Sequence, residues 1–211
     1  MEQSVIQCFA EDGPLSKVID GFKARQSQLD MATEVARAIK DKSPLVVEAG
    51  TGTGKTFAYL APALQSNKKA IVSTGTKALQ EQLFHRDLPL VKKALAPKMR
   101  VALLKGRSNY LCDYRLGVNG QHPPFTDEEF LNDLSKVRVW AAETDDGDLG
   151  DLTTVEEGSR VLPFVTSTVD NCLSKDCPNI AECHIMNARK KALEADLVVV
   201  NHHLFFADMA L

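Results

Sequence analysis

The chain has 211 residues, of which 44% are hydrophobic and 25% charged, as is ordinary for a globular protein with a sizeable core. No apolar run approaches the roughly 20 residues that a membrane helix needs, and the N-terminal segment lacks the features of a secretory signal, so we expect a cytoplasmic protein without membrane contact. Residues 127–157 hold 11 acidic side chains and two basic ones, so the net charge of −3 comes from one acidic stretch. We expect this stretch to be solvated, flexible and remote from any nucleic acid, whose phosphates would repel it.

The first part of the chain alternates between helical and strand patterns. Apolar residues recur at helical spacing from Gln28 to Ala38, which predicts an amphipathic helix. The apolar run Leu45–Val47 predicts a short buried strand. A glycine-rich turn follows at Gly50–Gly54, and a helix is expected to begin near Lys55.

The alternation continues toward the middle of the chain. Ala70–Ser73 predicts a second strand, Lys77–Phe84 an amphipathic helix and Arg100–Leu104 a third strand. Strands that alternate with helices indicate an α/β fold, in which a parallel sheet is covered by helices on both faces.

The pattern changes after residue 106. Thr126 and the acidic residues after it look like a capping box that opens a helix reaching Trp140. An acidic segment at 144–158 predicts a loop, 181–194 a helix, and the β-branched run 196–200 a buried strand that returns to the sheet. The sequence therefore predicts one α/β domain, residues 1–106 and 186–211, with an insertion at 107–185.

The segment Ala49–Thr56, with the sequence AGTGTGKT, matches the Walker A pattern apart from an alanine in place of the first glycine. Glycines allow backbone N–H groups to turn inward around phosphates, and the N-terminus of the next helix adds a positive partial charge. Lys55 is expected to reach the β- and γ-phosphates, and the Thr56 hydroxyl to ligate Mg²⁺. The predicted nucleotide-binding residues of the loop are Gly50, Thr51, Gly52, Thr53, Gly54, Lys55 and Thr56, with Lys55 and Thr56 also catalytic. Kinases, GTPases and transporters share this loop, so it does not by itself define the function.

Four cysteines form a candidate metal site. Cys172, Cys177 and Cys183 lie close together in the sequence, and Cys112 lies 60 positions before the first of them. Four thiolates suit either tetrahedral zinc or an iron–sulfur cluster, and the spacing alone leaves both open, together with unliganded core thiols. The fifth cysteine, Cys8, lies far from the other four in the sequence and is expected to have no functional role.

Several motifs together resemble a known family. These are the Walker A segment, STGTKALQ at 73–80, LKGRSNYLC at 104–112, VNHHL at 200–204 and the cysteine spacing. In combination they are similar to the XPD-like iron–sulfur DNA helicases of superfamily 2, specifically the bacterial DinG/YoaA branch, with the YoaA subgroup as the nearer likeness. The family's Walker B carboxylates and second motor domain do not appear, so we expect this chain to be the N-terminal piece of a longer helicase, with little or no activity alone.

The resemblance implies the fold and the functional residues. The implied fold is a partial RecA-like P-loop motor domain with an inserted, mostly helical iron–sulfur domain. The implied activity is that of an ATP- and Mg²⁺-dependent helicase, which moves 5′→3′ on single-stranded and forked DNA in repair or replication. We expect the protein to be a monomer that binds replication or repair proteins. Gln28 and Arg25 would contact the nucleotide, and the four cysteines would hold a [4Fe–4S] cluster. The residues expected to contact DNA are Ser73, Thr74, Thr76, Lys105, Arg107 and Tyr110. His202 and His203 are interpreted as a structural part of a turn after the last strand.

Two alternatives from other classes stay open at this point. One is a nucleotide-linked redox or iron sensor that binds DNA, and the other is a zinc-stapled P-loop ATPase that does not act on DNA. A helix cap at Ser73 or Thr76 is the simple alternative to their predicted DNA contacts.

Overall fold

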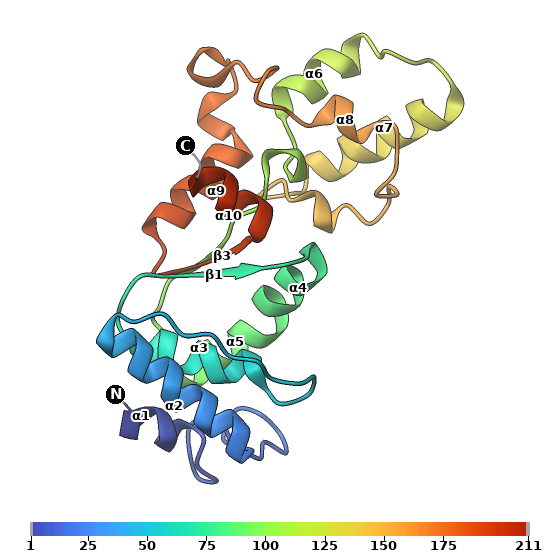
Figure 1. Ribbon diagram of the computed structural model, residues 1–211. Coiled ribbons are helices and arrows are strands. Elements are labelled where there is room, and N and C mark those ends of the chain that lie inside the picture. Colours follow the sequence, from blue (N-terminus) through green and yellow to red (C-terminus); the bar gives the residue numbers. More distant parts are fainter. Residues whose placement is uncertain (1, 210–211) are drawn as a thin grey trace. The chain divides into compact units, whose positions relative to one another are not determined.

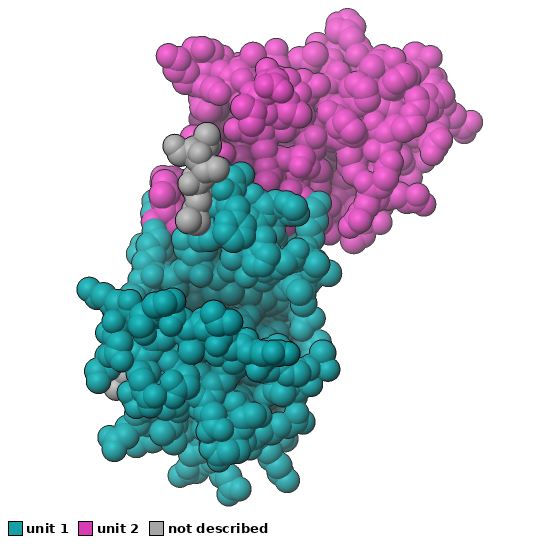
Figure 2. Space-filling view, viewed as in Figure 1, with its two compact units in different colours: residues 1–103, 194–211 teal, residues 104–193 magenta. Residues whose placement is uncertain are grey.

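The structure is a computed structural model that describes residues 2–209, and it divides into two compact units. Unit 1 comprises residues 1–103 and 194–211, and unit 2 comprises residues 104–193 (Figure 2). Within unit 1 the elements in chain order are α1 (Glu2–Cys8), α2 (Gln26–Asp41), α3 (Lys55–Gln65), β1 (Ala70–Thr74), α4 (Lys77–Gln82), α5 (Leu88–Leu95), β2 (Val101–Leu103), β3 (Leu197–Asn201) and α10 (His202–Met209). A π-helical turn, Leu83–Asp87, joins α4 to α5.

The sheet of unit 1 has three parallel strands in the order β1-β3-β2 (Figure 1). Ala70 pairs with Leu197 on one side of β3, and Val101 pairs with the same residue on the other side. β3, the last strand among the described residues, is therefore the central one, and it is the most thoroughly buried, as its run of β-branched residues predicts. The prediction of an α/β fold with a parallel sheet is confirmed, and the sheet is small.

Helices α2, α3 and α5 cover one side of this sheet. Their apolar faces form a core with Leu197 and Val199 of β3, and Ala32, Ala36 and Leu60 are fully buried in it. Helix α10 contacts β1 and β3 (Figure 1). The predicted helical patterns at 28–38 and 77–84 are confirmed, although the second continues through the π-helical turn into α5.

The predicted strand at Leu45–Val47 is wrong. The segment has no regular secondary structure, and its three side chains are exposed, Val46 to 97%. A strand exists only where a neighbour receives its backbone hydrogen bonds, and among residues 2–209 no strand pairs with this segment. Apolar content alone therefore misidentified it.

Unit 2 contains α6 (Asp113–Gln121), α7 (Glu128–Ala141), α8 (Leu162–Val165) and nearly all of α9 (His184–Glu194), with short 3₁₀ turns between them. Its core gathers Leu111, Leu134 and Val161 around an aromatic cluster in which Phe125, Phe130 and Phe164 meet edge to face. The cap of α7 is Asp127, whose side chain accepts a hydrogen bond from the Phe130 N–H, so the expected cap at Thr126 is one residue too early.

Candidate functional site: a phosphate-binding loop and a cysteine cavity

The glycine-rich loop leads directly into α3. Gly54 is the N-cap of this helix, and both Gly52 and Gly54 adopt left-handed backbone conformations with φ of 74° and 79°. Only glycine enters this region without steric cost, so these two positions require it. Lys55 and Thr56 consequently begin the helix, where unpaired N–H groups favour anions.

Two side chains of the α2 region hold the loop from outside. The Arg25 guanidinium donates to the Gly52 carbonyl, and the Gln28 amide Nε2 donates to the Gly54 carbonyl at 3.0 Å. Gln28 is 5% exposed, and a Cβ added to Gly54 would lie 2.1 Å from its Nε2. The structure thus brings both predicted residues against the phosphate-binding loop.

The two predicted catalytic residues are the first two of α3. The Lys55 Nζ donates to the carbonyls of Ala49 and Gly50, each at 2.7 Å, and so lies inside the curve of the loop. Thr56 lies one turn before Tyr59 in α3. Burial raises the pKa of Tyr59, so the phenol stays protonated at neutral pH.

The hydroxyls expected to touch DNA lie at and just beyond the carboxyl end of β1. The Ser73 Oγ is 2.7 Å from the His202 Nδ1, and the Thr74 Oγ1 donates to the Thr76 carbonyl at 3.2 Å. Thr76 is the N-cap of α4, since its hydroxyl accepts from the Leu79 N–H. The alternative of a helix cap therefore describes Thr76, while the DNA contacts of all three hydroxyls stay predictions.

The two histidines begin a helix. His202 and His203 are exposed and form the first turn of α10, so the expected turn after β3 is wrong as a description of the backbone. The side chain of Asn201 accepts from the Leu204 N–H at 2.7 Å, which caps this helix and explains why the chain turns into it at once.

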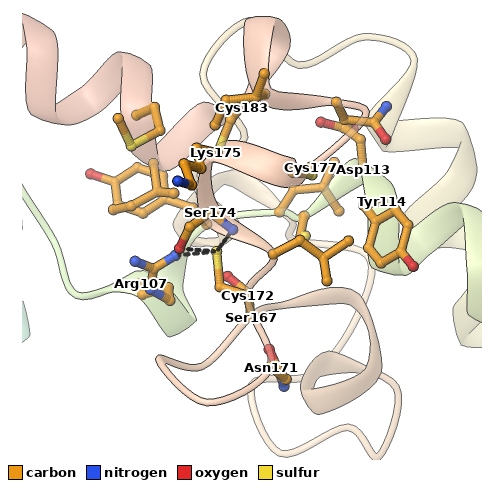
Figure 3. Close-up of a pocket in the computed structure, with 18 of the residues that line it drawn as sticks. Arg107, Asp113, Tyr114, Ser167, Asn171, Cys172, Ser174, Lys175, Cys177 and Cys183 are labelled. Carbon is orange, nitrogen blue, oxygen red and sulfur yellow. Dashed lines mark hydrogen bonds between the residues drawn. The ribbon is translucent and has the colours of Figure 1, made fainter.

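All four predicted cysteine ligands line one cavity of about 270 Å³ in unit 2. Figure 3 labels three of them, Cys172, Cys177 and Cys183. Cys112 is the residue before α6, Cys183 the residue before α9, and Cys172 and Cys177 flank a 3₁₀ turn. Among residues 2–209 no group of three or more His, Cys, Asp or Glu side chains has the arrangement to hold a single metal ion.

The cavity supplies hydrogen-bond donors to its sulfurs. The Cys172 Sγ accepts from the Arg107 guanidinium at 3.1 Å and from the Ser174 N–H at 3.4 Å (Figure 3). Burial alone would raise the pKa of Cys172, but these donors and the charge of Arg107 outweigh it and lower that pKa. Burial raises the pKa of Cys112, opposed by the Arg115 backbone N–H. Such donors stabilise thiolates and are typical of sites where sulfur binds metal.

The three residues predicted to grip DNA beside Cys112 have other roles here. Lys105 is 7% exposed, and its Nζ lies 2.6 Å from the Asp148 carboxylate. Tyr110 is 4% exposed, and its hydroxyl accepts from the Lys105 backbone N–H. Arg107 binds Cys172. Lys105 and Tyr110 are therefore buried in this structure, and the predicted contacts of Lys105, Arg107 and Tyr110 with DNA stay predictions.

Part of the acidic stretch belongs to the framework of unit 2. Asp148 is 8% exposed and accepts from both the Lys105 Nζ and the Gly150 N–H. The expectation that the acidic stretch at 127–157 is solvated and flexible is therefore wrong for this residue. A cation and an anion 43 positions apart give no local pattern, so the sequence offered no signal for the pair.

Comparison with known proteins agrees with this geometry. The model of the DEAD/DEAH box helicase family matches residues 30–136, just over half of the chain. The chain therefore belongs to the DEAD/DEAH box helicase family.

Within that family the similarity is specific. The chain is 56% identical over 209 residues, 99% of its length, to the ATP-dependent DNA helicase YoaA of Haemophilus influenzae. It is 56% identical over 201 residues to the protein of the same name in Escherichia coli, and 36% identical over 230 residues to the ATP-dependent helicase DinG of Mycobacterium tuberculosis. It belongs to the DinG/YoaA branch, as predicted. The chain spans about a third of the length of these curated relatives. No helix within residues 2–209 is long and apolar enough to cross a membrane.

Proposed function

We propose that the chain is the nucleotide-binding part of an ATP-dependent DNA helicase. The observation that carries this proposal is the arrangement around the loop, where Arg25 and Gln28 hold the carbonyls of two left-handed glycines directly before Lys55. Membership of the helicase family and the printed names of the relatives support the use of ATP on DNA.

In this proposal the triphosphate takes the place of the carbonyls that now hold Lys55. The ammonium would leave Ala49 and Gly50 for the β- and γ-phosphate oxygens, while the loop N–H groups and the start of α3 add further positive potential. The Thr56 hydroxyl, in the first turn of α3, would be the Mg²⁺ ligand, and the metal would neutralise phosphate charge. Arg25 and Gln28, whose side chains bind loop carbonyls here, would contact the nucleotide, as the resemblance implies.

For the nucleic acid, we propose that Ser73, Thr74 and Thr76 contact the phosphates of a single strand. Small hydroxyls at the carboxyl end of a parallel strand suit backbone contacts that carry no sequence preference. Movement 5′→3′, forked DNA, a role in repair or replication, a monomeric state and association with other repair or replication proteins follow from the resemblance and stay proposals. Action on chromosomal DNA requires the expected cytoplasmic location.

The cysteine cavity is proposed to hold a [4Fe–4S] cluster within an inserted domain at 107–185. All four cysteines line one cavity, and the Arg107 guanidinium and the Ser174 N–H donate hydrogen bonds to the Cys172 sulfur there. When bound, the cluster would supply four strong bonds that staple the segments of unit 2 together. The flanking parts, 1–106 and 186–211, would then form one motor domain.

Nucleotide binding tests the proposal most directly. A fluorescent ATP analogue titrated into the 211-residue chain should bind with Mg²⁺, and Lys55→Ala should weaken binding about 10- to 100-fold because a charge-assisted contact is lost. The matched control is Lys98→Ala, which removes an exposed lysine of the same unit. Equal affinities for the two variants would refute the assignment.

The action on DNA is tested in the protein that carries this chain. Lys55→Ala should abolish ATP-driven separation of forked duplexes, and a protein that hydrolyses ATP without separating strands would favour the P-loop ATPase alternative. Anaerobic purification should give brown protein with iron and sulfide. Colourless protein with zinc would favour the zinc alternative, and a cluster whose oxidation changes DNA affinity while the fold survives would favour the sensor.

A further inference from the structure

We infer that Asp113, Gly147 and His184 form a brace that positions Cys112 and Cys183 before any cluster is bound. The inference rests on the proposed cluster site, and it assigns a task to three residues of unit 2 that are not themselves ligands. Asp113 directly follows Cys112, and His184 directly follows Cys183.

A contact between these two neighbours joins the ends of two helices. The His184 Nε2 lies 3.4 Å from the Asp113 Oδ2, and the side chains are only 12% and 29% exposed. Asp113 is the first residue of α6 and His184 the first of α9, so the contact fixes two helix starts together with the cysteine that precedes each of them. Partial burial makes such a contact more geometrically defined than a surface ion pair.

Gly147 holds the other side of the histidine. A Cβ at this position would lie 2.4 Å from the His184 Cγ, so only glycine leaves room for the ring. Its φ of 66° also lies in the left-handed region that other residues avoid. The ring of His184 is thus confined between this backbone and Asp113.

The same glycine is bound to the segment that carries Cys112. Its carbonyl accepts from the Leu111 N–H at 2.8 Å, and its own N–H donates to the Thr144 Oγ1 at 3.0 Å. The contacts therefore close a circuit in which Leu111, Gly147, His184 and Asp113 connect the two cysteine-bearing segments.

These contacts join the two cysteine-bearing segments that are farthest apart in the sequence, where bringing the thiols together costs the most chain entropy. Cys172, Cys177 and Cys183 lie within 12 consecutive positions, whereas Cys112 and Cys183 are separated by 71. Bringing distant thiols together costs chain entropy, and contacts that form without the metal remove that cost from metal binding. Outer-shell contacts of this kind commonly change metal affinity about 10- to 100-fold.

The experiment compares Gly147→Ala with the matched control Gly158→Ala in the 211-residue chain. Gly158 lies in the same unit, and a Cβ there meets nothing within 4 Å. The first readout is hydrogen exchange at the Leu111 amide in cluster-free protein, measured by NMR. Gly147→Ala should speed this exchange about tenfold, the equivalent of one hydrogen bond, and the control should not.

The second readout is the rate at which a chelator bleaches the reconstituted cluster. Gly147→Ala and His184→Ala should each lose the cluster about tenfold faster than the wild type. His184→Gln, whose amide can still reach Asp113, should recover part of that loss. A purely structural role would not distinguish Gln from Ala in this way at equal thermal stability.

The outcomes distinguish failure of the brace from failure of the proposed cluster site. If Gly147→Ala exchanges and bleaches like Gly158→Ala, the brace is refuted, whatever the cluster does. If the wild type takes up no cluster, the proposed function fails at this site, while faster Leu111 exchange in Gly147→Ala would still support the brace in the cluster-free protein.

Discussion

Replacing Gly54 by alanine should destabilise unit 1 through two identifiable effects. Gly54 has φ of 79°, and a left-handed conformation costs an L-residue about 1–2 kcal/mol. The new Cβ would lie 2.1 Å from the Gln28 Nε2, so Gln28 must move and give up its hydrogen bond to the Gly54 carbonyl, a loss of about 1 kcal/mol. The sum is about 2–3 kcal/mol.

Thermal unfolding measures this loss. For a chain of this size 1 kcal/mol lowers Tm by about 2–4 °C, so Gly54→Ala should lower the Tm of unit 1 by roughly 5–10 °C. The matched control is Gly50→Ala in the same loop, because a Cβ there meets nothing within 4 Å and the backbone is not left-handed. Its Tm should stay within about 2 °C of the wild type.

A double-mutant cycle isolates the clash. In Gly54→Ala combined with Gln28→Ala the steric conflict is absent, so the double variant should be more stable than the sum of the two single changes predicts, by about 1 kcal/mol. Strict additivity, or an equal Tm for Gly50→Ala and Gly54→Ala, would show that Gln28 does not hold the loop as described.

Three further predictions concern stability. Lys105→Met should cost about 3–5 kcal/mol in urea unfolding because it strands the buried Asp148 carboxylate, and a cost under 1 kcal/mol would mean that the pair is solvated. Ser159 and Lys136 hold the pKa of Asp133 below its usual value, so Ser159→Ala should cost about 1 kcal/mol at pH 7. Because a lowered pKa stabilises the fold above the unfolded-state value, this difference should vanish as the pH falls through the folded-state pKa, and a pH-independent difference would contradict it. Thr76→Ala should cost about 1 kcal/mol through the lost cap of α4 while Thr76→Ser costs little, and equal losses would exclude capping.

Much of the secondary structure of unit 1 could be predicted from local sequence patterns. The helix at 28–38, the helix start at Lys55 and the strand at 196–200 could be predicted because periodicity, glycine placement and β-branched content act within a few residues. The Walker A segment was recognisable for the same reason, since its glycines and lysine are consecutive.

Pairing over long distances could not be predicted in this way. Leu45–Val47 has the composition of a strand, but whether it pairs depends on residues elsewhere in the chain. Lys105 looked like a surface cation because its partner Asp148 lies 43 positions away inside an acidic stretch. Charged side chains are mostly exposed, so a sequence reading places Lys105 at the surface. Only the three-dimensional structure shows that Lys105 is buried together with an oppositely charged residue.

The central position of β3 has a consequence for how the chain folds as it is synthesised. Among residues 2–209, β1 and β2 each pair only with β3, which lies some 90 residues after β2, so these three strands cannot form their sheet until Asn201 has left the ribosome. Unit 2, whose internal contacts all lie between residues 104 and 193, can form first and shorten the effective loop that β3 must close. Ribosome-bound chains in which Leu193 has emerged from the exit tunnel and Leu197 has not should therefore show a protease-resistant unit 2 beside a protease-sensitive N-terminal segment.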